Sequence, residues 1–181
     1  LPPMPQLIDY AHHEIRCDWM DVFLGATCQF CIGTSSGYYV IPFAFGKPIV
    51  LTNLPQVTPY YGLTRQDLLL PRRLINVESG KHLSFEQYMS PSASMLTNDK
   101  QFSDAGLRWV ENTPEELEYA IREMLQRTSD SSSSPQSDDD LQRRFKTIAE
   151  KCGLKYGGQQ VRALASVSQD FLAQHAELLE G

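Results

Sequence analysis

The residues from 28 to 53, CQFCIGTSSGYYVIPFAFGKPIVLTN, constrain the fold more than any other part of the chain. Residues 28–33 form a short apolar run that ends in glycine, which is typical of a buried strand. Residues 38–45 are mainly apolar and stop before Gly46, so they predict a short helix. Residues 48–51 form a second apolar run and predict a second strand. Two strands joined through a helix make a βαβ unit, so we expect an α/β fold with a parallel sheet flanked by helices.

The loop between the first strand and the helix is built from small residues, in the order Gly33, Thr34, Ser35, Ser36 and Gly37. These residues offer hydroxyls, backbone N–H groups and a flexible chain. Open α/β sheets bind ligands beyond the carboxyl ends of their strands, and free N–H groups at the start of a helix suit a phosphate. Asn53, at the end of the second strand, is expected to line the same cleft. The loop matches neither the Walker nor the Rossmann fingerprint, so a plain structural turn stays the alternative.

Three segments carry a resemblance to a known family: residues 18–24 (DWMDVFL), 30–37 (FCIGTSSG) and 45–53 (FGKPIVLTN). They resemble a family of bacterial glycosyltransferases and, more broadly, the C-terminal, nucleotide-sugar-binding half of GT-B glycosyltransferases. In such enzymes a helix leads into a strand, a G-[TS]-x-S-G loop, a helix and a G-x-P-[IV]-[IV] strand. The match is densest over residues 18–53 and continues more loosely to about residue 89. The resemblance implies a Rossmann-like open sheet, the GT-B C-terminal half.

The same resemblance implies a function. The chain would bind a nucleotide-diphosphate sugar for transfer to an acceptor hydroxyl in surface polysaccharide synthesis, with Gly33, Thr34, Ser35, Ser36, Gly37 and Asn53 as the substrate-binding residues. The loop would compensate the charge of the departing diphosphate. The donor sugar nucleotide takes the place of a cofactor, and the resemblance implies no metal, because GT-B enzymes commonly need none. The implied partners are a glycan or lipid-linked acceptor and an N-terminal domain that holds the catalytic base, so no catalytic residue is assigned and the fragment alone is expected to be inactive.

Size and charge limit the other classes of function. The 181 residues suffice for one α/β domain, and the start with Leu inside Pro-rich sequence suggests a fragment of a longer chain. The formal net charge of −6 argues against a general nucleic-acid surface, although a local phosphate site remains compatible with it. No apolar run approaches the roughly 20 residues of a membrane helix. The resemblance implies a cytoplasmic location, with the inner face of the membrane as a further option.

Two other functions stay open from the residues. A sugar-nucleotide epimerase shares the GT-B architecture and would need acid and base groups in the cleft, for which His12, His13 and Asp67 are the candidates. A non-catalytic interaction domain would keep the fold without the chemistry. The irregular residues 54–62 include Tyr60 and Tyr61, which would either stack on a base or sugar or cover the core.

The cysteines favour packing over chemistry. Cys28 and Cys31 are spaced as in a metal or redox motif, but no second pair with matching spacing is present. Positions three apart on a strand point to opposite faces. We therefore expect buried, reduced thiols at both positions.

Helix signals are clear in several places. Asp18 begins a helix whose apolar face, Trp19, Val22, Phe23 and Ala26, is expected to pack on the sheet. The run TPEE at 113–116 predicts a capped helix start, with a buried stripe formed by Leu117, Ile121, Met124 and Leu125. Residues 129–140, SDSSSSPQSDDD, are expected to form a mobile loop before the next helix.

The stretch between residues 74 and 89 predicts a hairpin followed by a short helix. Apolar residues 74–77 and 82–85 flank ESGK, which suits a tight turn. Ser84 and Gln87 have the spacing of a capping box, in which each side chain bonds the backbone N–H of the other residue.

Overall fold

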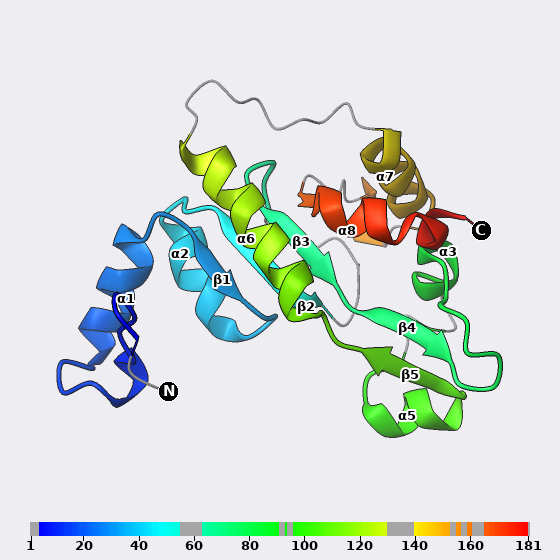
Figure 1. Cartoon of the computed structure of the whole chain (residues 1–181), viewed down its shortest axis with the longest axis horizontal. Helices are drawn as coiled ribbons and strands as arrows, with labels where there is room; N and C mark the ends of the chain where they lie inside the picture. Colours follow the sequence, from blue (N-terminus) through cyan, green and yellow to red (C-terminus); the bar gives the residue numbers. More distant parts are fainter. Residues whose placement is uncertain are drawn as a thin grey trace.

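The computed structural model describes residues 4–54, 63–90, 93, 96–129, 140–152 and 165–180, together with the backbone of two short strands, β6 (Lys155–Tyr156) and β7 (Gln159–Gln160). Figure 1 traces the chain from the N-terminal helix on one side of the sheet to the C-terminal helices on the other. The predicted loop at 129–140 and the two tyrosines at 60 and 61 fall almost entirely outside the described residues, because only Ser129 and Asp140 are described there.

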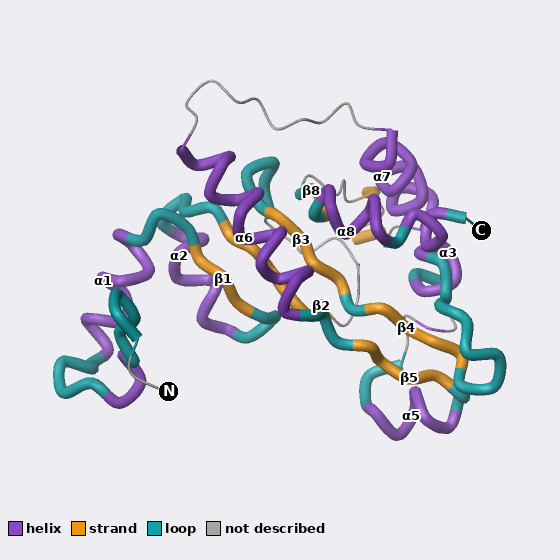
Figure 2. The backbone as a smooth tube through the Cα atoms, in the orientation of Figure 1, coloured by secondary structure: helices purple, strands orange, loops and turns teal. Residues whose placement is uncertain are grey.

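A parallel sheet forms the centre of the molecule. Its strands are β1 (Cys31–Gly33), β2 (Ile49–Leu54), β3 (Leu68–Pro71) and β8 (Ser166–Val167), in the order β1-β2-β3-β8. All three pairings are parallel, and Figure 2 shows β1, β2 and β3 running side by side. The prediction of an α/β fold with a parallel sheet flanked by helices is confirmed, and this topology is compatible with a Rossmann-like fold. The first strand was predicted over residues 28–33, but β1 includes only residues 31–33.

Helices cover the sheet and its ends. The long helix α6 (Pro114–Ser129) lies across β2 and β3, with α8 (Gln169–Gln174) beside it (Figure 1). α7 (Asp140–Cys152) packs against α8, α3 (Phe85–Tyr88) and the C-terminal 3-10 turn η3 (Ala176–Leu179). On the other side, η1 (Tyr10–His12) precedes α1 (Asp18–Thr27), which packs against α2 (Val40–Ala44). Among the described residues, no helix is long and apolar enough to cross a membrane.

A small antiparallel sheet extends the end of β3. β4 (Arg73–Asn76) pairs with β5 (Leu107–Val110), and α5 (Asp99–Asp104) leads into β5. The predicted hairpin is confirmed in part: Ile75 and His82 form an antiparallel bridge, while the longer ladder of β4 is with β5. The tight turn itself is present, and Gly80 takes the left-handed φ of +66° that favours glycine.

Aromatic side chains join these parts into one core. Phe85 of α3 meets Phe145 of α7 edge to face at 5.1 Å between ring centroids. Trp109 of β5 contacts Phe102 at 4.6 Å and Tyr88 at 5.6 Å. The buried strands β2 and β3 belong to the same cluster, so apolar burial connects the parallel sheet, the antiparallel pair and the C-terminal helices.

The N-terminal helix does not pack on the sheet as predicted. Trp19 is 68% exposed and Phe23 43% exposed, and the two rings stack on each other with centroids 5.2 Å apart. The buried residue of α1 is Gly25, which lies against Ile41 of α2. Because Gly25 has no side chain, α1 approaches α2 closely at this position. This contact sets the orientation of α1, so the apolar face that carries Trp19 points away from the core.

The long helix α6 begins as predicted but is rotated relative to the expected stripe. Its buried residues are Glu116, Ala120 and Met124, spaced four apart, whereas Leu125 is 41% exposed. The capping box at the start of α3 is confirmed: Gln87 N–H donates to Ser84 Oγ and Ser84 N–H donates to Gln87 Oε1.

Candidate functional site

The predicted ligand loop lies at the carboxyl edge of the parallel sheet. Residues 33–37 follow directly from β1, and Thr34, Ser35, Ser36 and Gly37 are exposed. The Ser36 hydroxyl does not cap the turn that follows it. Within the part of the chain that is described, Thr34 and Ser35 have no hydrogen-bond partner through their hydroxyls. These oxygens are therefore accessible to a ligand.

The helix expected over residues 38–45 is present over residues 37–44, but only its second part is α-helical. A 3-10 turn, η2 (Gly37–Tyr39), runs into the five residues of α2, which contain Pro42. Proline fixes its own backbone and lacks the N–H that would continue the hydrogen-bond ladder, so a long regular helix is not favoured here. Any anion bound at this loop would depend mainly on local N–H and hydroxyl groups, since such a short helix carries little dipole.

The end of β2 is held next to the loop. Thr52 Oγ1 donates a hydrogen bond to the Gly33 carbonyl oxygen at 3.3 Å. The register between β2 and β3 shifts after Thr52, and Asn53 there takes a φ of +50°. Asparagine tolerates this left-handed conformation better than most residues with a side chain. The structure thus brings the predicted site residues Gly33 and Asn53 to the same edge of the sheet.

Two polar groups of Asn53 are nevertheless already hydrogen-bonded within the protein. Its N–H donates to Asn112 Oδ1 at 2.7 Å, and its own Oδ1 accepts from the Asn112 N–H at 2.8 Å. Asn112 Nδ2 also donates to the Pro71 carbonyl oxygen at 2.8 Å. These bonds connect the ends of β2 and β3 to the segment before α6. The Asn53 side chain therefore shapes the edge, and the exposed hydroxyls of the loop remain the groups available to a ligand.

A buried carboxylate, Glu116, lies near the same edge, where its Oε2 accepts from Asn112 Nδ2 at 3.4 Å. Its Oε1 accepts from Arg73 at 3.2 Å and contacts His175 Nε2 at 2.8 Å, while Oε2 accepts from the Thr113 N–H at 2.9 Å. The Glu116 side chain is only 3% exposed. One carboxylate thus joins β4, α6 and the end of α8.

The pKa of Glu116 follows from these partners. Burial by itself raises the pKa, because it disfavours the charged form. The hydrogen bonds from His175 and from the Thr113 N–H, together with the charge of Arg73, outweigh burial and lower the pKa of Glu116 below its ordinary value. Glu116 is therefore an ionised structural anchor at neutral pH.

Sequence reasoning found Glu116 only as a helix cap. The capping geometry is correct, since Glu116 N–H donates to Thr113 Oγ1 at 3.2 Å. The missed signal is the spacing of Glu116, Ala120 and Met124, which places a carboxylate on the buried face of α6. A buried carboxylate requires a cation, and Arg73 provides it from a strand whose position the sequence did not reveal.

The candidates for acid–base chemistry lie away from the loop. Asp67 precedes β3, where its carboxylate accepts from Ile49 N–H at 2.8 Å and from Thr64 N–H at 2.6 Å. Burial raises the pKa of Asp67, while these hydrogen bonds lower it in part. Because the strands are parallel, their starts lie at the opposite edge from residues 33–37. His12 and His13 are exposed before α1, and His12 Nδ1 lies 3.2 Å from Asp9.

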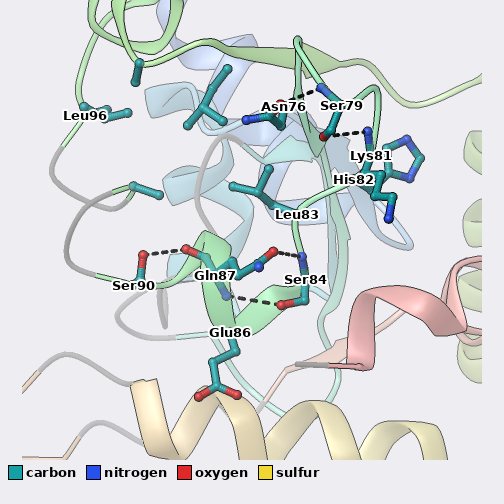
Figure 3. Close-up of a pocket in the computed structure, with 13 residues that line it drawn as sticks. Asn76, Ser79, Lys81, His82, Leu83, Ser84, Glu86, Gln87, Ser90 and Leu96 are labelled. Atoms are coloured by element: carbon teal, nitrogen blue, oxygen red, sulfur yellow. Dashed lines mark hydrogen bonds between the residues drawn. The ribbon is translucent and has the colours of Figure 1, made fainter.

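A cavity of about 800 Å³ opens beside the antiparallel sheet, between the turn after β4 and α3 (Figure 3). Several of its polar side chains are hydrogen-bonded to nearby backbone groups. Asn76 Oδ1 accepts from the Ser79 N–H, and Ser90 Oγ donates to the Gln87 carbonyl oxygen. Glu86 at its rim pairs with Lys151. Lys81 and His82 also line this cavity, whereas residues 33–37 and Asn53 do not.

The cysteines carry no metal-site geometry. Cys28 and Cys31 are free and half-buried, and burial raises the pKa of both thiols. A raised pKa keeps them protonated and poorly reactive near neutral pH. Among the residues described, no group of three or more His, Cys, Asp or Glu side chains could hold a metal ion.

No protein-family model, curated protein or solved structure matches this chain significantly. The class of protein is therefore defined by the fold alone: an α/β protein with a parallel sheet, a loop of small residues at its carboxyl edge and a buried carboxylate linked through Asn112 to the ends of β2 and β3.

Proposed function

We propose that this chain is the donor-binding domain of a GT-B-type glycosyltransferase and that residues 33–37 hold the diphosphate of a nucleotide sugar. The observation that carries the proposal is the position of this loop. Residues 34–37 are exposed at the carboxyl edge of a parallel sheet, where open α/β sheets bind their ligands. The resemblance of the same residues to the GT-B loop motif supports the proposal.

The loop would act by stabilising the negative charge of the leaving diphosphate. When an acceptor hydroxyl attacks the anomeric carbon of the donor sugar, the bond to the diphosphate breaks and negative charge grows on the leaving oxygen. Hydroxyls of Thr34, Ser35 and Ser36, with nearby backbone N–H groups, would donate to these oxygens. A chain with a net charge of −6 gives no general attraction to a diphosphate, so binding would depend on such local donors.

The network behind the loop would keep its geometry constant. Thr52 holds the Gly33 carbonyl, and the Asn53–Asn112 pair fixes the neighbouring strand end. A binding loop supported by bonded neighbours loses less conformational entropy when a ligand arrives. We assign no catalytic base to this chain; in the proposed enzyme another domain supplies it, together with the acceptor site.

The test is a titration of the isotope-labelled chain with UDP, GDP, ADP and CMP, followed through backbone amide shifts. The proposal expects saturable shifts at residues 33–37 for one diphosphate, weakened about tenfold by Ser36→Ala, since one charge-assisted hydrogen bond is lost. Ser103→Ala, at an exposed serine of α5, is the matched control and should change nothing.

If none of the four nucleotides shifts these amides, the titration is repeated with UDP-glucose and GDP-mannose, which add the sugar contacts. If the amide shifts of residues 33–37 do not change in this second series either, a donor site at this loop is refuted. Shifts that Ser36→Ala and Ser103→Ala weaken equally would also count against it.

A further inference from the structure

A second cavity, of about 420 Å³, lies at the opposite, amino edge of the sheet. Short segments that precede β1, β2 and β3 form one side of it, and the last turn of α6 forms the other. Figure 1 shows this end of α6 over the side of the sheet where β3 begins. The polar residues that line the cavity are Gln29, Lys47, Arg65, Gln66, Arg127 and Thr128.

The charged residues that line this cavity are all cationic. Lys47, Arg65 and Arg127 line it, and no carboxylate is among the lining residues in the described part of the chain. Within that same part, Lys47 and Arg65 make no ion pair, although acidic residues outnumber basic ones by 22 to 16 in the whole chain. Lys47 and Arg65 thus bring two cations without a counter-charge among the described residues to one cavity, which favours an anionic ligand.

Arg127 adds a fixed donor to this group. Its NH2 atom lies 2.6 Å from Glu123 Oε1, which holds the guanidinium in place, and its side chain is 17% exposed. Its NH1 atom is buried without an acceptor among the described residues. Because NH1 is inaccessible, a ligand in the cavity would meet the accessible part of this guanidinium, while Glu123 keeps the group in position.

Neutral donors complete the lining. Gln29 Nε2 donates to Thr128 Oγ1 at 2.9 Å, which joins the segment before β1 to the end of α6. Gln66 carries a further amide at the rim. The volume lies within the range of small-molecule sites, and a cavity of this size holds a phosphate group with a small organic body.

We propose that this cavity binds a small phosphate monoester, with Lys47, Arg65 and Arg127 contacting the phosphate. Arginine matches the geometry of phosphate oxygens, and lysine supplies a point charge. The site is separate from the donor loop and does not depend on the proposed transferase function, because the two lie at opposite edges of a parallel sheet.

The experiment titrates the labelled chain with inorganic phosphate and with ribose 5-phosphate at constant ionic strength, with sodium chloride as the salt control. The expected result is saturable shifts at the amides of Gln29, Gln66 and Thr128 with unchanged amides at residues 33–37. Lys47→Gln combined with Arg65→Gln should raise the Kd at least about tenfold, because two charged donors are lost. Tighter binding of ribose 5-phosphate than of inorganic phosphate supports a monoester as the ligand, and equal or weaker binding would overturn it.

Arg122→Gln is the matched control. This arginine lies on α6, as Arg127 does, but it is 67% exposed and paired with Glu118. It should leave the Kd unchanged. Shifts that do not saturate, that sodium chloride reproduces, or that the Arg122→Gln variant weakens as much as the double variant would overturn the proposal. Each outcome is independent of whether nucleotides bind at residues 33–37.

Discussion

Asn53 and Asn112 bind each other through two reciprocal hydrogen bonds, in which the backbone N–H of each residue donates to the side-chain Oδ1 of the other, at 2.7 and 2.8 Å. The two residues are far apart in sequence, yet this pair joins the end of β2 to the start of α6. It stabilises the positive φ of Asn53 and so fixes the strand end beside the candidate loop.

We expect Asn112→Ala to destabilise the protein by about 2–4 kcal/mol, because it leaves the Asn53 N–H and the Pro71 carbonyl without their partners. Urea denaturation followed by circular dichroism measures this. The control is Asn98→Ala, which removes only the N-cap of α5 and should cost about 1 kcal/mol. A smaller loss for Asn112→Ala than for Asn98→Ala would contradict the structural role of the pair.

We expect Glu116→Gln to cost about 3–5 kcal/mol near neutral pH, since it leaves the buried Arg73 without its counter-charge. The pKa of Glu116 is lowered in the folded state. Its contribution to stability is therefore complete above the pKa of the unfolded chain and is lost as the pH falls through the folded pKa. The difference between wild type and variant should shrink below about pH 4.3, the ordinary pKa of a glutamate.

The matched control for this pH dependence is Glu115→Gln, at the exposed neighbouring position in the first turn of α6. Urea midpoints of the three proteins, measured from neutral to acidic pH, give the comparison. A Glu116→Gln cost that stays constant with pH, or that matches the cost of Glu115→Gln, would show that the buried charge does not stabilise the fold.

The sequence predicted the features that depend on neighbouring residues. The parallel strands β1 and β2, the capping box of Ser84 and the start of α6 all follow from local patterns and were confirmed. The pairing of β4 with β5 was missed because the partners are about thirty residues apart, and no local pattern encodes such a pairing.

The candidate site also combines features that local sequence patterns predict with features that depend on tertiary contacts. Residues 33–37 and Asn53 were expected at one edge, because parallel strands end together, and the structure places them there. The roles of Asn53 and Glu116 in holding that edge were not predictable. Their partners, Asn112 and Arg73, come from other elements, and only the tertiary structure brings them within hydrogen-bond distance.

Exposure of the α1 face leads to a further prediction. Trp19→Ala should change the free energy of unfolding by less than about 1 kcal/mol, because the ring is mostly in water and loses only its stacking on Phe23. Phe145→Ala, at a fully buried ring in the core, should cost about 3–5 kcal/mol. Urea denaturation of both variants decides this. A similar cost at the two positions would mean that Trp19 packs in the core, as its sequence pattern indicated.

Gly25 provides the sharpest test of how α1 meets α2. A Cβ at this position would lie 2.8 Å from Ile41 Cγ2, a branched methyl close to the backbone, and 3.3 Å from Pro42 Cδ. Gly25→Ala should therefore destabilise the protein by about 1–3 kcal/mol through overpacking, although alanine favours a helix by up to about 1 kcal/mol over glycine. Thermal denaturation of the variant and the wild type measures the net effect.

A double-mutant cycle with Ile41→Ala separates the two contributions, because that change removes the clashing methyl. In the Ile41→Ala background, Gly25→Ala should cost at least about 1 kcal/mol less than it does alone, since residues in contact are energetically coupled. The higher helix propensity of alanine would then offset much of the remaining strain at Pro42. Additive effects of the two substitutions would mean that the helices do not approach each other at Gly25, and that the exposed orientation of Trp19 needs another cause.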